Sequence, residues 1–229
     1  MLTLRKASER GHINLGWLDS HHSFSFGHYY DPAHMGVSVL RVINQDIVQP
    51  NAGFDTHPHQ DMEILSYVLS GKLAHKDSMG HMQEIPVGEF QLMSAGTGVT
   101  HSEYNGAEGQ TTEFLQIWIR PDTKGLTPSY QQQAFDGKGL VKVVSPDGSD
   151  SSLKIHQDVS VYRGRFEADE QIDLPKTVGR QGYLQLVSGE VAVNGITLTA
   201  GDGVAVATDE GLVTLSSISA SEWLWFDLP

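Results

Sequence analysis

Short apolar runs, cut by glycine, proline and polar residues, follow one another along the whole chain. Residues 38–48, SVLRVINQDIV, are rich in β-branched side chains, and residues 62–71, MEILSYVLSG, form the nearly continuous apolar run of a strand covered on both faces. Asn194-Gly195 lies between two apolar arms, which is a strong signal of a β-hairpin. No sustained 3.6-residue period competes with this pattern. It predicts an all-β fold of sandwich or barrel type.

The spacing of the turns predicts two similar halves. Ser70-Gly71 ends one apolar run and Gly88-Glu89 opens another, and Ser188-Gly189 and Gly201-Asp202 repeat this arrangement 118 and 113 residues later. A five-residue loop deletion would reconcile the two offsets. We therefore expect two β-barrels in tandem, over residues 1–125 and 153–229. Residues 126–152, rich in Gln, Gly, Ser and Pro, are expected to be a connector with one short helix at Tyr130–Phe135.

Composition narrows the class of protein. Of the 229 residues, 24 are glycine, 39% are hydrophobic and 19% are charged, which suits a turn-rich β protein with a good core and excludes a disordered chain. Fifteen basic against 28 acidic residues give a net charge of −13, so we expect no direct contact with nucleic acid. There is no cysteine. Without an apolar signal segment or a long apolar run, we expect a cytoplasmic protein that does not insert into a membrane.

Two short motifs carry candidate metal ligands. His57-Pro58-His59 and His101-Ser102-Glu103 each place two ligand-type side chains two residues apart, which puts both on the same face of a strand with Cα atoms about 6.5–7 Å apart. Alone, the first pair is more typical of a solvated loop rich in histidine. Together, the two pairs offer three neutral nitrogens and one carboxylate oxygen, a set that suits Fe, Mn, Co, Ni or Cu and leaves one or two positions open. A closed structural zinc site would more often use thiolates.

The choice of carboxylate stays open on this reasoning. The first motif extends to Glu63, giving H-x-H-x3-E, and the second extends to Asn105, giving H-x3-N. If the strand stays regular, Glu63 lies on the same face as His57 and His59, either as a ligand or as a residue that orients one of the histidines. Spacing alone does not decide between Glu63 and Glu103.

These motifs resemble those of the cupin superfamily. The segment 80–88 between them reads G-x5-P-x-G, but seven residues separate Glu63 from Gly71 where the superfamily usually has six, and the histidine after Gly88 is delayed to His101. The same departures occur in the pirin family. The chain resembles that family in five segments, in this order: HSFSFGHYYDP, GFDTHPHQDMEILSYVLSG, HKDSMG, QLMSAGTGVTHSEYN and LQIWI. The resemblance is dense over residues 20–120 and continues more thinly through IHQDVSVYRG.

The resemblance implies a bicupin, with two face-to-face antiparallel β-barrels of jelly-roll type and few short helices. It implies one divalent transition metal in the N-terminal barrel, Fe(2+) first, with Mn, Co, Ni, Cu or Zn as alternatives. It places the metal ligands on His57, His59, His101 and Glu103, and so excludes Glu63. Adding the 118-residue offset to His57 and His59 gives Pro175 and Thr177, so the C-terminal barrel is expected to hold no metal and to be structural.

The resemblance also implies an activity. Pirin-family members can act as quercetin 2,3-dioxygenases, which open the central ring of a flavonol with O2 and release carbon monoxide. Glu103 is then the candidate catalytic base for the substrate's 3-hydroxyl proton; another planar enediol or a diketone would present the same oxygen pair. Two alternatives remain: a metal-containing regulatory module bound to a protein partner, without turnover, and a structural relic stabilised by its metal.

The other eight histidines are expected not to be ligands. Among them, His22 alternates with Phe24 and Phe26 in a strand-like segment, which predicts an aromatic face over the mouth of the barrel. Trp118 is expected in the core.

Overall fold

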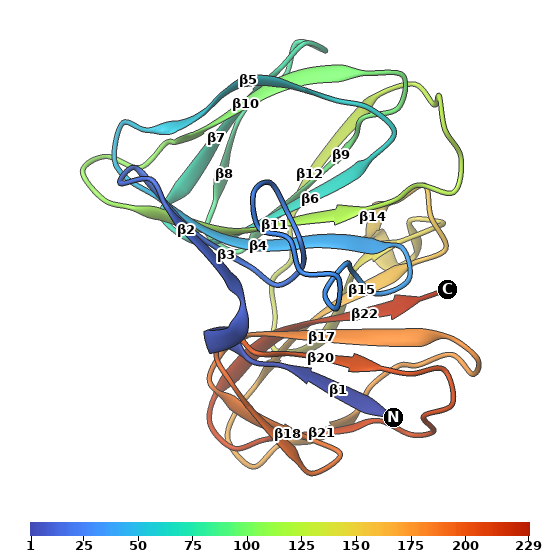
Figure 1. Ribbon diagram of the computed structural model, residues 1–229. Helices are drawn as coiled ribbons and strands as arrows, with labels where there is room; N and C mark the ends of the chain where they lie inside the picture. The colour runs from blue at the N-terminus through green and yellow to red at the C-terminus, as the bar shows by residue number, and fades with distance from the viewer. The chain divides into compact units, whose positions relative to one another are not determined.

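The chain forms two compact units, which together contain all described residues, 1–229, of this computed structural model (Figure 1). The N-terminal unit comprises Gly11–Phe135 and Ile155–Gln157. The C-terminal unit comprises Met1–Arg10, Asp136–Lys154 and Asp158–Pro229. Its first segment belongs there because the opening strand pairs antiparallel with a strand that begins at Gly203.

The N-terminal unit consists of two antiparallel sheets. The larger contains, in order, β12 (Ser129–Ala134), β9 (Glu89–Ser94), β6 (Glu63–Ser70), β11 (Thr112–Ile119), β4 (Leu40–Val48), β3 (Leu18–His22) and β2 (Gly11–Asn14). The smaller contains β5 (Gly53–His59), β10 (Val99–Asn105), β7 (Lys72–Asp77) and β8 (Met82–Pro86). Buried apolar side chains from both sheets meet between them. Each sheet is a separate ladder, so side-chain packing rather than continuous hydrogen bonding closes the barrel.

The C-terminal unit repeats this arrangement. Its larger sheet contains, in order, β1 (Leu2–Arg5), β20 (Gly203–Val206), β17 (Gln181–Ser188), β22 (Ser221–Leu228), β15 (Ser160–Phe166), β13 (Gly139–Ser145) and β14 (Leu153–Lys154). Its smaller sheet contains β16 (Gln171–Asp173), β21 (Thr214–Ser217), β18 (Glu190–Val193) and β19 (Ile196–Thr199). Only the two-residue β14 pairs in parallel, with β13. The two units therefore share the order of their four central strands and of their smaller sheets, and differ in how the edge strands are connected.

The glycines that suggested a repeat occupy equivalent turns. Gly71 joins β6 to β7 with a φ of +73°, and Gly189 joins β17 to β18 with a φ of +83°. A Cβ would lie 2.6 Å from a backbone oxygen at Gly71 and 2.2 Å from one at Gly189. Backbone conformation and close approach thus both require glycine here. The predicted tandem β architecture is confirmed at these turns.

The predicted strands are present, and one predicted helix is wrong. Asn194 and Gly195, with φ of +44° and +84°, form the expected tight turn between β18 and β19. The segment 130–135 is not helical: residues 130–134 lie in β12, an edge strand paired with β9. Its run of glutamines has no apolar stripe for a helix to bury, so pairing with the exposed edge of β9 decides its conformation. The helices are two short 3-10 turns, η1 (Ala7–Glu9) and η2 (Ser149–Ser151).

No helix is long and apolar enough to span a bilayer.

Candidate metal centre

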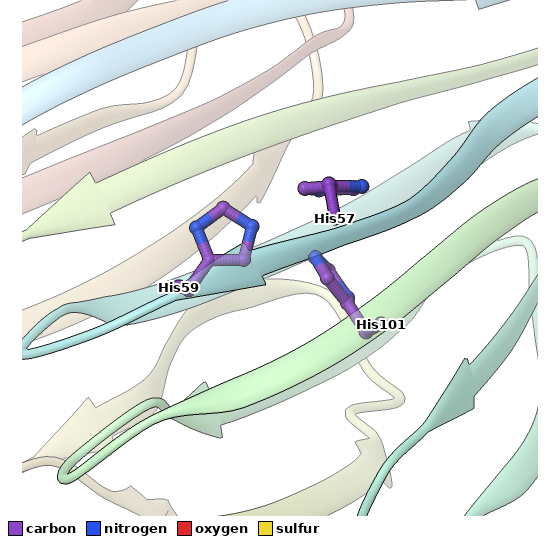
Figure 2. Close-up of side chains that lie close together, drawn as sticks. All are labelled: His57, His59 and His101. Atoms are coloured by element: carbon purple, nitrogen blue, oxygen red, sulfur yellow. The ribbon is translucent and has the colours of Figure 1, made fainter.

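Two neighbouring strands carry the three histidines predicted to bind metal. His57 and His59 lie on one face of β5, and His101 on β10 is the cross-strand partner of His57. Ring centroids are 4.5 Å apart for His57 and His101 and 4.8 Å apart for the other two pairs. Figure 2 shows the tip of the His101 ring directed toward the other two rings. Their ligand atoms all lie within 4.8 Å of one another, and we call this set the histidine triad.

Glu103 lies deeper in the same barrel. The register between β10 and β5 shifts between His101 and Glu103, so a bulge separates the two residues, and the Glu103 side chain is buried. Its Oε2 accepts a 2.7 Å hydrogen bond from Gln116 Nε2, and its Oε1 accepts one of 3.3 Å from Ser66 Oγ. Glu103 belongs to a second group of ligand atoms, with His75 and His101, that adjoins the triad through His101.

The triad presents the nitrogens that a metal needs. His57 Nδ1 donates to the backbone oxygen of Asp55 at 2.7 Å, which leaves Nε2 with its lone pair. His101 Nε2 is buried and has no hydrogen-bond partner in the protein. Burial first, and then the neighbouring histidines, lower the pKa of His59 to about 4 and that of His101 to about 3. Neutral imidazoles at pH 7 are the form that binds divalent transition metals, so these residues fit such an ion.

Behind the triad lies a buried pair to which the sequence prediction assigned no role. His75 Nε2 is 3.1 Å from Asp77 Oδ2, and both side chains are fully buried. Burial acts to raise the pKa of Asp77, but hydrogen bonds from His75 and His81 outweigh it and hold the pKa below its usual value. The spacing His75-Lys76-Asp77 within one strand was the available signal, because residues two apart share a face.

A row of polar side chains crosses the inner face of the larger sheet beneath the triad. Cross-strand pairing aligns one residue from each of five strands, and all five are buried: Gln91, Ser66, Gln116, Asn44 and His22. We call this set the polar row. The side-chain amide of Gln91 and the Oδ1 of Asn44 have no partner in the protein. Unpaired buried polar groups cost stability, so we infer that the polar row is present for binding rather than for packing.

Aromatic rings form one wall beside the triad. Phe26 contacts Trp118 edge to face at 5.3 Å, and Trp118 contacts His59 in the same way at 5.0 Å. His22 packs against Phe26 at 5.4 Å. The aromatic segment predicted from the sequence therefore reaches the metal-binding end of the barrel, and Trp118 both packs against the core and contacts a candidate ligand.

Glu63 faces away from the triad. Beyond His59 the chain turns at Asp61, whose φ is +49°, so the strand does not continue regularly into Glu63. The Glu63 carboxylate accepts hydrogen bonds from Ser94 Oγ at 2.9 Å and from the backbone N–H of His156 at 3.4 Å. Burial raises its pKa. Glu63 therefore serves as a local anchor of this segment.

A further buried carboxylate lies on β4 of the larger sheet. Asp46 on β4 accepts a short hydrogen bond from Ser20 Oγ, and Ser20 in turn is 2.8 Å from His22 Nε2. Burial raises the pKa of Asp46 to about 7, with a smaller contribution from the charge of Glu103. Near neutral pH the interior thus holds a carboxyl group close to its protonation midpoint.

Comparison with known protein families covers both units. Residues 3–119 match the family model Pirin, and residues 142–228 match the model described as the quercetinase C-terminal cupin domain. A quercetin 2,3-dioxygenase of Escherichia coli (strain K12) is 51% identical over 230 residues, covering 100% of this chain and 99% of that protein. A pirin-like protein of Caulobacter vibrioides is 38% identical, covering 99% of each chain.

A solved structure agrees with the fold. The crystal structure of the bacterial pirin YhhW from Escherichia coli in complex with nickel(II) superposes with a TM-score of 0.97 at 50% identity, covering 100% of this chain and 99% of that one. The relative and the solved structure thus cover the whole chain, and the two family models cover most of each unit. The chain belongs to the pirin family, with two cupin domains.

Proposed function

We propose that the protein is a metal-dependent quercetin 2,3-dioxygenase, which opens the central ring of a flavonol with O2 and releases carbon monoxide. The observation that carries the proposal is the convergence of three imidazoles, His57, His59 and His101, beside the buried carboxylate of Glu103. The full-length relative from Escherichia coli that bears this name, at 51% identity, supports it.

The metal would be held by the histidine triad, with Glu103 as fourth ligand. We propose Fe(2+), because the donor set of nitrogen and carboxylate oxygen suits it; Mn, Co, Ni, Cu and Zn are alternatives, and the YhhW relative has been crystallised with nickel(II). When bound, the ion would supply Lewis acidity toward the adjacent oxygen pair of the substrate. Metal analysis of freshly purified protein tests the choice of Fe(2+).

Glu103 is the group that can accept the 3-hydroxyl proton of the flavonol. It is the carboxylate of the proposed ligand set, and bonds from Gln116 and Ser66 fix its orientation. The proton leaves the substrate oxygen for a Glu103 carboxylate oxygen, and the substrate keeps the electron pair. The dioxygenase step then inserts both oxygen atoms of O2 and expels one ring carbon as CO.

The aromatic rings beside the triad favour a planar substrate. Phe26 and Trp118 place two rings edge to face beside His59, and such surfaces favour stacking or edge contact with an aromatic ligand. A flavonol would present such a planar face to these rings, as would another planar enediol or diketone.

The test is direct. Iron-loaded protein is incubated with quercetin in air, and loss of flavonol absorbance is followed together with CO. We expect one CO for each quercetin consumed, with loss of activity in His101→Gln and retained activity in His28→Gln, a matched change at an exposed histidine. Absence of turnover with every divalent metal tried would overturn the proposal and favour the regulatory alternative.

A further inference from the structure

The two ring nitrogens of His101 face different surroundings. Nε2 is buried, has no partner in the protein, and belongs to the ring tip directed toward His57 and His59 in Figure 2. Nδ1 lies on the other side, 3.5 Å from Nδ1 of His75. A neutral imidazole carries one hydrogen, so whichever nitrogen bears it cannot offer a lone pair to a metal. The tautomer of His101 therefore decides whether the triad is complete.

Asp77 determines which nitrogen of His75 bears hydrogen. Its Oδ1 accepts hydrogen bonds from the backbone N–H groups of Met79, at 2.9 Å, and His81, at 3.0 Å, and its Oδ2 lies 2.9 Å from His81 Nδ1. Surrounded by donors, Asp77 acts as an acceptor for His75 as well, so His75 Nε2 carries the hydrogen. Nδ1 of His75 is then a lone pair that faces His101.

We propose that Asp77 and His75 are positioning residues that set the tautomer of His101. Because His75 Nδ1 is an acceptor, His101 Nδ1 donates to it, and His101 Nε2 is left with its lone pair toward the triad. The inference rests on the proposed metal site. It extends the usual carboxylate–histidine–metal arrangement by one further imidazole.

Packing holds this chain of groups in place. The ring of Tyr130 lies 5.0 Å from that of His75 and is stacked on His81 at 4.7 Å. The side chains of His75 and Asp77 are fully buried, so water does not compete for the hydrogen bond from His75 to Asp77. The geometry is therefore fixed before a metal arrives.

The tautomer can be read without metal or substrate. Long-range nitrogen–proton NMR correlations of the imidazole rings distinguish Nδ1–H from Nε2–H in the metal-free protein. We expect Nδ1–H for His101 and Nε2–H for His75. An Nε2–H signal for His101 in the wild-type protein would overturn the proposal, whatever the outcome of the quercetin assay. Conversely, the expected tautomers in a protein without turnover would leave this inference standing while the proposed function failed.

Two isosteric variants separate the roles of the two His75 nitrogens. His75→Asn keeps an acceptor near the Nδ1 position, and His75→Gln keeps a donor to Asp77 near the Nε2 position but removes the acceptor. We expect His75→Asn to keep the His101 tautomer. His75→Gln should lose it and bind nickel(II) about 10–100-fold more weakly in calorimetry, the usual effect of such outer partners.

His81→Gln is the matched control, because His81 also contacts Asp77 but not His101. We expect its nickel affinity to stay near that of the wild type. Equal affinity and an unchanged tautomer in His75→Gln would overturn the proposal. Should a His75 variant fail to fold, the wild-type NMR spectrum still decides the matter.

An independent observation points to a second metal site on the surface. His12 on β2 and His21 on β3 are cross-strand partners, and their rings are stacked at 4.4 Å with 13° between the planes. Asp19, two residues before His21, has Oδ1 2.9 Å from His12 Nε2 and 3.5 Å from His21 Nδ1. The three ligand atoms lie within 4.8 Å of one another. Asn14 donates to the other oxygen of Asp19 at 3.0 Å and orients it.

The geometry points to a divalent transition metal held by His12, His21 and Asp19 once the two imidazoles turn out of their parallel stack, with water in the remaining positions. Two imidazole nitrogens and one carboxylate oxygen are a typical donor set for Ni(II), Zn(II) or Cu(II). The hairpin fixes the two strands, so little chain entropy is lost on binding.

Counting bound nickel(II) tests this second site. We expect two equivalents for the wild type and one for His12→Gln, with His28→Gln as an exposed control that keeps two. His101→Gln should remove the other equivalent. One equivalent in the wild type, or two in His12→Gln, would overturn the surface site without affecting the barrel site.

Discussion

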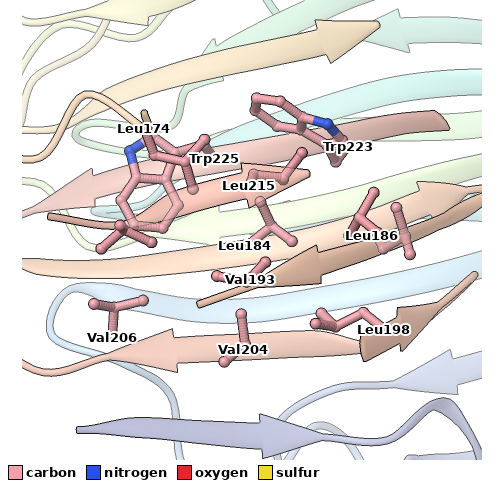
Figure 3. Close-up of a cluster of buried hydrophobic side chains, with 12 residues drawn as sticks. Leu174, Leu184, Leu186, Val193, Leu198, Val204, Val206, Leu215, Trp223 and Trp225 are labelled. Carbon is pink, nitrogen blue, oxygen red and sulfur yellow. The ribbon is translucent and has the colours of Figure 1, made fainter. Parts of the chain in front are cut away.

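The two units share a scaffold but differ in what fills it. In the N-terminal unit, strands β9, β6, β11 and β4 contribute Gln91, Ser66, Gln116 and Asn44 to the polar row. At the same places in the C-terminal unit, the aligned residues of β20, β17, β22 and β15 are Val204, Leu184, Trp225 and Tyr162. Figure 3 shows the resulting cluster of leucine, valine and tryptophan side chains. One backbone plan thus supports a polar interior and an apolar one.

The smaller sheets differ in the same way. Pairing between β7 and β10 aligns His75 with Glu103, and the equivalent pairing between β18 and β21 aligns Val193 with Leu215. Two residues earlier on the chain, His101 corresponds to Val213. Buried valine and leucine offer no metal ligand, and they fill the space that imidazoles and a carboxylate occupy in the other unit.

Stability and chemistry are concentrated in different units of the molecule. Apolar burial contributes about 25 cal/mol per Å² to stability, whereas each buried polar group without a partner costs about 1–3 kcal/mol. The C-terminal unit gains the first term in its core cluster, although Trp223 Nε1 and Asp227 Oδ1 are buried in that unit without a partner. The N-terminal unit carries the second at Gln91, Asn44 and His101, as expected of a site that binds something in addition to packing.

We expect the strongest loss of function when the N-terminal unit is given the residues of its counterpart. His101→Val combined with Glu103→Leu removes two proposed ligands and the proposed base, so metal should be lost and turnover should fall more than about 10⁴-fold, beyond the contribution of a base alone. Metal analysis and CO release measure this. Thr100→Val with Ser102→Ala alters the same strand at positions outside the set and should keep both metal and activity.

Removing the proposed base Glu103 alone should have the next largest effect on turnover. In metal-saturated protein, Glu103→Gln should lower kcat about 10²–10⁴-fold, because an amide cannot accept the 3-hydroxyl proton. Steady-state kinetics with quercetin measures it. Full turnover with the metal retained would show that Glu103 is not the base.

A stability comparison follows from the paired positions Leu184 and Ser66. Leu184→Ala leaves a cavity in an apolar core and should cost about 2–5 kcal/mol of unfolding free energy, while Ser66→Ala should cost about 1 kcal/mol through one lost hydrogen bond. Urea unfolding followed by tryptophan fluorescence measures both. Equal costs would contradict the assignment of stability to the C-terminal core.

The free energy of unfolding should also depend on pH, because buried titratable groups lie in the polar interior of the N-terminal unit. Because the pKa of His101 is about 3 in the folded protein and about 6.5 when unfolded, the unfolded state binds the extra proton between these values. Stability of the metal-free protein should then fall as pH drops from 6.5, by at most about 1.4 kcal/mol per pH unit from His101. Urea unfolding at pH 7 and pH 5 measures the slope, which His101→Gln should reduce.

The carboxyl group of Asp46 should have a weaker influence on the pH dependence of stability, in the opposite direction to His101. The pKa of Asp46 is raised to about 7, so the folded state binds the extra proton and stability is lost as pH rises from about 4 toward 7. Asp46→Asn mimics the protonated group and should gain stability over the wild type across that range. Its counterpart in the C-terminal unit is Gly164, which faces Trp223 and does not titrate. A constant difference between variant and wild type at pH 4.5 and 7 would contradict the shift.

Local signals explain what the sequence predicted. Gly71 and Gly189 mark turns that only glycine fits, and Asn194-Gly195 specifies its hairpin through backbone geometry. The two-residue spacing of His57 and His59 placed both rings on one face, and the resemblance to the pirin family selected Glu103 over Glu63. The fourth ligand stays a prediction, since Glu103 lies in the group that adjoins the triad.

Non-local pairing explains what the sequence missed. Ser66 looks like an ordinary member of an apolar run, and only the register with β11 and β9 shows that it belongs to the polar row. His75 and Asp77 gain a role from the position of His101, which lies on another strand. The strand at 129–134 depends on the free edge of β9, which no local pattern records.

The pairing of β1 with β20 has a consequence for synthesis of the protein. Leu2 pairs with Val206 and Arg5 with Gly203, so a strand from the start of the chain finds its hydrogen-bonding neighbour roughly 200 residues later. During translation this strand emerges ahead of the barrel that will bind the metal, yet it must wait until nearly the whole chain has left the ribosome. Closing so long a loop is slow. We therefore expect that the first strand to be synthesised completes its pairing only after one of the last strands has been synthesised.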